Sequence, residues 1–205
     1  MHTRHGSALL ALVTACLFFA GCDDSSSPLS NPEKSKPDAR LAGIWRLRND
    51  DGDVIYYHMG RPGEKLPGSM LRVVGVKHTK NGNLEQGGEL LIFPTTLGTG
   101  TYLNVADGSE QQIKLLEEKG RRPELFTNFF LPKYKIEGDR LLLWFMDGDA
   151  KRQAIESGKI KGLIRKEKST TTVRFTDTTE NLARFVASAG DSLFSKEPIR
   201  LERVK

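Results

Sequence analysis

Short apolar stretches separated by glycine- and aspartate-rich turns run along most of this 205-residue chain and constrain its fold more than any other feature. Two of the turns, Asn81-Gly82 and Glu137-Gly138-Asp139, have the composition of tight hairpin connections. The stretches predict strands at residues 43–48, 54–59, 70–78, 89–93, 101–106, 133–137, 140–146, 159–166, 171–176 and 199–204. Many short strands at this spacing predict a mainly β fold, an antiparallel barrel or sandwich.

Two of these stretches also predict how the strands are covered. Between residues 159 and 165, basic side chains alternate with isoleucine and glycine, which predicts one solvated face and one buried face. Residues 141–146 are apolar throughout, as expected of a strand that is covered on both sides.

One or two short helices are expected to interrupt the strands. Residues 149–157 predict a short helix capped by Asp149. Residues 177–194 predict a better one, with Asp177 as cap and Glu180 three positions later, as in a capping box. Its apolar residues recur at helical spacing: Leu182, Phe185, Val186, Ala189 and Leu193. The pattern favours docking of this stripe on the sheet over contact with a partner or a membrane.

The N-terminus has the features of a signal peptide spanning residues 1–21. Arg4 gives it a positive start, and the small and apolar run that follows is about 13 residues long, shorter than the roughly 20 needed to span a bilayer. The run ends in Phe19-Ala20-Gly21-Cys22, which resembles the lipobox of bacterial lipoproteins. An ordinary secretory signal with an incidental cysteine and an uncleaved anchor are the alternatives.

The lipobox resemblance implies that Cys22 is lipidated. Two or three acyl chains such as palmitate anchor a protein stably, so we expect a membrane-bound cell-envelope protein facing the periplasm. Cys16 leaves with the signal peptide, so the mature chain would have no free thiol and no disulfide. Asp23 and Asp24 resemble the signal that retains enterobacterial lipoproteins in the inner membrane, which favours that membrane over the outer one. Their alternative role is a polar start to a linker.

Residues 22–40 are expected to form a flexible tether. The segment is rich in serine, proline, aspartate and lysine, and Leu29 is its one large apolar residue. Such a composition buries too little apolar surface to offset the entropy of ordering, and a coil of this length spans about 25 Å. Residues 41–205 then remain for one β-rich domain, about 165 residues, which is long enough for a sizeable core.

The first predicted strand carries Gly43 and Trp45 in a G-x-W pattern, which resembles the opening strand of lipocalins and lipocalin-like domains. The resemblance implies a tryptophan that closes one end of a barrel and an arginine that packs on its indole. Arg203 in the last strand is the candidate for that arginine. The chain lacks a T-D-Y motif, and its better helix precedes the final strand. These departures favour a lipocalin-like barrel over a true lipocalin.

Four further segments resemble a group of bacterial envelope lipoproteins of unknown activity. They are residues 101–105, 133–145, 154–162 and 193–204. The resemblance covers much of the domain and implies the same mainly β architecture, but it implies no reaction and no ligand.

The sequence offers no catalytic or metal-binding motif. After cleavage only His58 and His78 remain, and zinc sites need more histidine or cysteine ligands. The acidic turns at residues 49–53 and 146–151 lack the spacing of a calcium loop. We therefore expect a protein that is not an enzyme and has no metal and no cofactor.

Basic residues crowd the segment from Lys151 to Lys168, and the whole chain has a formal charge of +5. A basic face of this kind is suited to anionic lipid headgroups or acidic envelope polymers. The favoured alternative is a solvated strand face that discourages edge pairing. The envelope compartment argues against nucleic acid as a partner.

Aromatic residues supply the candidate ligand-binding site. Inside a barrel they could line a cavity for a lipid-like molecule, and otherwise they belong to the core. The candidates are Trp45, Phe126, Phe129, Phe130 and Tyr134. The expected function is a non-catalytic β domain that binds a small hydrophobic ligand. The alternative is a protein-interaction or envelope-maintenance lipoprotein with a filled core.

Overall fold

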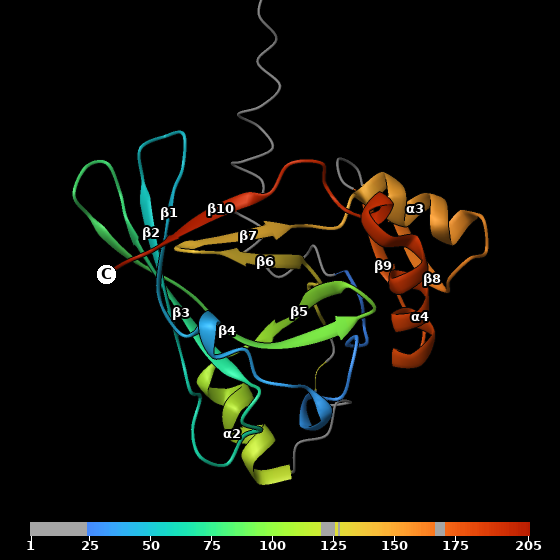
Figure 1. Ribbon diagram of the computed structural model, residues 1–205, viewed down its shortest axis with the longest axis horizontal. Helices are drawn as coiled ribbons and strands as arrows, with labels where there is room; N and C mark the ends of the chain where they lie inside the picture. The colour runs from blue at the N-terminus through green and yellow to red at the C-terminus, as the bar shows by residue number, and fades with distance from the viewer. Residues whose placement is uncertain (1–23, 120–125, 127, 167–170) are drawn as a thin grey trace, which may run out of the picture.

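The computed structural model describes residues 24–119, 126, 128–166 and 171–205. The signal peptide, Cys22 and Asp23 lie outside the described residues. Within them, eight antiparallel strands pair in the closed order β1-β10-β7-β6-β5-β4-β3-β2 (Figure 1). The strands are β1 (Gly43–Arg48), β2 (Val54–Gly60), β3 (Leu71–His78), β4 (Leu84–Leu97), β5 (Gly100–Asp107), β6 (Lys133–Glu137), β7 (Arg140–Trp144) and β10 (Ile199–Arg203).

The barrel is irregular where β5 meets β6. The two strands share one residue pair, Tyr102 with Lys133, and the contact continues through a hydrogen bond from Leu103 N to Pro132 O at 2.9 Å and an isolated bridge between Val105 and Phe130. The mainly β, antiparallel fold predicted from the sequence is confirmed, and each predicted strand overlaps an observed one. The hairpin at Asn81-Gly82 is also confirmed, with Gly82 at a φ of 83°.

A second layer lies against one side of the barrel. It contains the two-stranded sheet of β8 (Gly162–Lys166) and β9 (Thr171–Phe175), together with α3 (Gly148–Glu156) and α4 (Thr179–Ala189) (Figure 1). The helix caps differ from those predicted. Asp147 caps α3 and Thr178 caps α4, because their side chains accept hydrogen bonds from Ala150 N and Asn181 N.

A third helix, α2 (Glu110–Lys119), was not expected from the sequence. It is amphipathic and buries only Ile113 and Leu116, so its apolar signal is weak. Three short 3-10 turns complete the described elements: η1 (Pro32–Lys34), η2 (Ala39–Leu41) and η4 (Gly190–Leu193). No helix among the described residues is both long enough and apolar enough to span a membrane.

Alternate residues of the barrel strands fill the interior of the barrel. This period of two is expected, because successive side chains of a strand point to opposite faces. The buried members of this inner core are Leu41, Trp45, Leu47, Ile55, Tyr57, Met59, Val73, Ile92, Leu103, Val105, Tyr134, Leu141, Leu143 and Leu201. The interior of the barrel is therefore filled by the protein's own side chains.

A second core lies outside the barrel, beneath the helices. Residues 91–95 of β4 and 102–106 of β5 are buried at consecutive positions, so these strands are covered on both faces. Leu182 and Val186 of α4 are fully buried in this outer core together with Phe175. The predicted docking of the α4 stripe is therefore confirmed.

The first residues that the structure describes, from Asp24 onward, do not form the expected flexible tether. Asp24 and Ser25 both donate backbone hydrogen bonds to the Phe129 carbonyl, at 2.8 and 3.1 Å. On the other side, Phe175 N donates to Asp24 O at 2.8 Å, so residues 24–26 extend the β8–β9 sheet. Leu29 is 2% exposed and packs in the outer core.

Polar contacts explain why so polar a segment is held in place. Leu29 N donates to the buried Asn104 Oδ1 at 2.6 Å, and Ser69 Oγ donates to Pro32 O at 2.6 Å. Asp24 forms a buried ion pair with Lys151. Hydrogen bonds to buried partners supply the free energy of docking that the small apolar surface of this segment cannot supply. Composition reports apolar surface but not such hydrogen bonds, and it therefore mispredicts residues 24–40.

The G-x-W corner has the geometry that the sequence predicts. The guanidinium of Arg203 lies 4.2 Å from the centroid of the fully buried Trp45 ring. Trp45 Nε1 donates to Leu41 O at 2.8 Å, and Arg203 Nη1 donates to Ala42 O at 2.8 Å. Gly43 is required here, since its φ is 125° and a Cβ would lie 2.7 Å from Arg203 Nη1.

Candidate functional site

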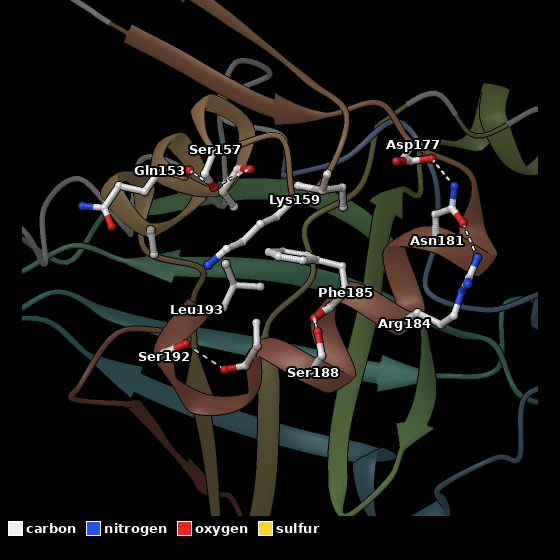
Figure 2. Close-up of a pocket in the computed structure, with 14 residues that line it drawn as sticks. Gln153, Ser157, Lys159, Asp177, Asn181, Arg184, Phe185, Ser188, Ser192 and Leu193 are labelled. Carbon is white, nitrogen blue, oxygen red and sulfur yellow. Dashed lines mark hydrogen bonds between the residues drawn. The ribbon is translucent and has the colours of Figure 1, made fainter.

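A cleft of about 1070 Å³ lies between α3, α4 and η4 (Figure 2). Its floor is apolar. Ala154 of α3, Ile160 in the loop before β8, and Leu193 of η4 are all buried there, and Phe185 of α4 is half-buried. Phe185 belongs to the α4 stripe but lies at its edge, so part of its ring remains open to the cleft.

Hydroxyl groups form much of the rim of this cleft. Ser188 Oγ donates to Phe185 O at 2.9 Å, and Ser192 Oγ donates to Ala189 O at 2.7 Å. On the α3 side of the cleft, Ser157 Oγ donates to Gln153 O at 2.7 Å. Because these hydroxyl hydrogens are already used within their own helices, the oxygens remain available as acceptors for an incoming donor.

A chain of polar side chains closes one end of the cleft (Figure 2). Asn181 Nδ2 donates to Asp177 Oδ1 at 2.7 Å, and Arg184 Nη2 donates to Asn181 Oδ1 at 2.5 Å. The hydrogen bond from Asn181, with those from the backbone N–H groups of Lys161 and Thr178, lowers the pKa of Asp177. Asp177 is therefore a buried carboxylate whose hydrogen-bonding capacity is already met by the protein.

Two cations of the cleft have no acidic partner among the described residues. Lys159 extends from the loop after α3 into the space between α3 and Leu193 (Figure 2). Arg184 is exposed, and its guanidinium donates to the neutral side chain of Asn181. An apolar floor beside two cations is suited to a ligand that combines an apolar group with a carboxylate.

The barrel interior offers much less room. A cavity of about 50 Å³ lies among side chains of the inner core, Phe130 among them. Pockets that hold small molecules usually have about 300–1000 Å³. Tyr57 also lines this cavity, and its hydroxyl has no hydrogen-bond partner among the described residues. Burial raises the pKa of this hydroxyl, so it stays protonated.

The five aromatic residues predicted to form one ligand site are divided between the two cores. Trp45 and Tyr134 pack in the inner core, and Tyr134 OH donates to Asp38 Oδ2 at 3.0 Å. Phe126 and Phe129 belong to the outer core, with ring centroids 5.7 Å apart. Phe130 alone of the five lines the barrel cavity.

The basic segment is divided as well. Lys151 is buried and pairs with Asp24 at 2.6 Å, whereas Lys159, Lys161, Arg165 and Lys166 are exposed. Lys168 lies outside the described residues. His58 and His78 are both exposed, and His78 contacts the Tyr56 ring edge-on at 5.1 Å. In the described part of the chain, no three His, Cys, Asp or Glu side chains gather in a way that could hold a metal ion.

Comparison of the chain with models of known protein families, with curated proteins and with solved structures finds no match. The function must therefore be inferred from the residues and their geometry.

Proposed function

We propose that this protein is a non-catalytic lipoprotein of the bacterial cell envelope, anchored through Cys22, whose β domain binds another envelope protein in the α3–α4 cleft. The contrast between the two hollows carries the proposal. The protein's own side chains fill the barrel interior and leave a cavity of only about 50 Å³, whereas the external cleft measures about 1070 Å³. This contrast favours the filled-core alternative over a hydrophobic ligand inside the barrel.

The chemistry of the cleft supports a peptide segment as its occupant. An apolar centre with a polar rim is the usual anatomy of a protein interface. Small residues on its floor, such as Ala154 and Ala189, leave room for an apolar side chain of the partner. Lys159 and Arg184 would then attract a neighbouring carboxylate, and the serine oxygens would accept from its backbone N–H groups.

The anchor is tested by labelling cells with palmitate. Label is expected in the wild-type chain and in Cys16→Ser, because Cys16 lies in the segment that is removed. Cys22→Ser should lose the label and leave the membrane fraction. Continued labelling of Cys22→Ser would defeat the proposed anchor.

The cleft is tested by photocrosslinking in intact cells, with a photoreactive side chain at Ser188 and, as a control, at the exposed Thr96 on β4. We expect a discrete protein adduct from position 188 only. Because like charges at an interface cost several kcal/mol, Lys159→Glu with Arg184→Glu should reduce this adduct by about ten-fold or more.

The matched control for that charge reversal is Arg48→Glu, which changes an exposed cation on β1. It should leave the adduct at position 188 unchanged. Equal adducts from positions 188 and 96, or an adduct that persists in the double variant, would contradict binding in the cleft. Co-purification of one lipid molecule per protein, held inside the barrel, would favour the hydrophobic-ligand alternative.

A further inference from the structure

The chain is fixed to the domain only two residues after the proposed anchor. The backbone of Asp24 bonds to Phe129 and Phe175, and its carboxylate pairs with buried Lys151 at 2.6 Å. Two peptide units span about 7 Å at most. An acylated Cys22 would therefore hold this edge of the β8–β9 sheet at the membrane surface, and not about 25 Å above it as a coil would.

One face of that sheet is exposed. In the register of β8 and β9, Leu163 lies opposite Arg174, and Arg165 opposite Thr172. Leu163 is 55% exposed, which makes it one of the few large apolar side chains on the surface of the described residues. The other face of the sheet is covered, since Val173 and Phe175 are buried.

The exposed face is positively charged. Lys161 and Arg165 are exposed and lie two positions before and two after Leu163, so the extended backbone places all three side chains on the same face. Two described carboxylates beside this sheet are engaged elsewhere: Asp24 pairs with Lys151, and Asp177 accepts from Lys161 N and Asn181.

We propose that this β8–β9 face lies against the anionic phospholipid headgroups of the membrane that carries acylated Cys22, with Leu163 at headgroup depth. The inference rests on the anchor proposed above. Cations within a Debye length of an anionic bilayer each contribute about five-fold in affinity, which follows from about 1 kcal/mol per residue. Two such cations, Lys161 and Arg165, favour one orientation of a protein that acyl chains already hold at the surface.

The orientation has a consequence for the cleft. Phe175 of β9 contacts Phe185 of α4 on the covered face of the sheet, with ring centroids 5.6 Å apart. The helices therefore pack on the side opposite Leu163, and a membrane against Leu163 leaves the cleft free for a partner.

The test uses the full chain, acylated in cells, purified in detergent and reconstituted into vesicles. The mature acylated protein has no other free thiol, so Leu163→Cys accepts a single fluorophore. Leu84→Cys is the matched control, because Leu84 is also exposed, at 68%, and the β3–β4 turn lies across the barrel from β8 and β9 (Figure 1). Quenching is measured against phospholipid that carries a spin label on its headgroup.

In vesicles of phosphatidylcholine with phosphatidylglycerol, we expect quenching at position 163 to be several-fold stronger than at position 84. Lys161→Glu with Arg165→Glu, or vesicles of phosphatidylcholine alone, should lower it toward the value at position 84. Arg48→Glu with Lys80→Glu, which changes exposed cations on the barrel hairpins, should have no such effect.

Equal quenching at positions 163 and 84 in a protein whose mass shows acylated Cys22 would overturn the proposed orientation and leave the anchor standing. Strong quenching at position 163 that ignores both phosphatidylglycerol and the charge reversal would overturn the electrostatic contact. A mass that shows unmodified Cys22 would overturn the anchor and, with it, this inference.

Discussion

Replacing Lys151 by methionine is expected to lower the free energy of unfolding by about 3–5 kcal/mol, because it leaves a buried aspartate without its counter-charge. The side chains of Lys151 and Asp24 are 10% and 7% exposed, and Nζ lies 2.6 Å from Oδ1. Asp24 Oδ2 also accepts from the Leu131 backbone N–H at 3.0 Å, so the carboxylate cannot turn toward water without losing that bond. Urea unfolding of the purified full chain, followed by circular dichroism, measures the change.

Two control variants separate the buried pair from other effects. Asp24→Asn added to Lys151→Met should recover most of the loss, because a buried ion pair replaced by neutral groups of similar shape is often no less stable. Lys135→Met breaks the exposed pair with Glu137 and should cost about 0–1 kcal/mol. If Lys151→Met cost no more than Lys135→Met, Asp24 would not be docked and the flexible tether predicted from composition would stand.

The strands were predictable because their signals are local. The first strand was predicted at residues 43–48 and is observed there, since alternation and flanking turns act over a few residues. The docking of residues 24–40 was not predictable, because the residues they contact are distant in sequence. Asp24 meets Lys151 across 127 positions, and no local pattern of serines and aspartates reveals such a contact.

The candidate site was harder to predict than the fold. Phe129 and Phe130 are adjacent in the sequence and suggest one aromatic cluster. The extended backbone sends them to opposite sides, so Phe129 packs in the outer core while Phe130 lines the barrel cavity. The cleft combines α3 with α4 and η4, which are separated in the sequence by β8 and β9. No local sequence pattern marks the cleft: Phe185 and Ala189, which line it, differ from the rest of the α4 stripe only in being half-buried in the structure.

The packing of Arg203 on Trp45 was predictable from the resemblance of the G-x-W pattern to lipocalin-like domains. Because the Trp45 side chain is large and fully buried, its truncation is expected to lower the free energy of unfolding strongly. Trp45→Ala is expected to cost about 3–5 kcal/mol, because it removes a fully buried ring from the inner core. It also removes the surface on which Arg203 stacks at 4.2 Å. Urea unfolding of the purified variant measures the loss.

Trp45→Phe and Trp144→Ala separate what the ring and its N–H contribute. The phenylalanine keeps most of the apolar burial but leaves the Leu41 carbonyl without the 2.8 Å bond from Nε1, so we expect a loss of about 1–3 kcal/mol. Trp144 is only half-buried, so its truncation should cost less than that of Trp45. Equal costs at the two tryptophans would contradict the full enclosure of Trp45 in the inner core, because only a ring enclosed on all sides leaves a cavity that its neighbours cannot fill.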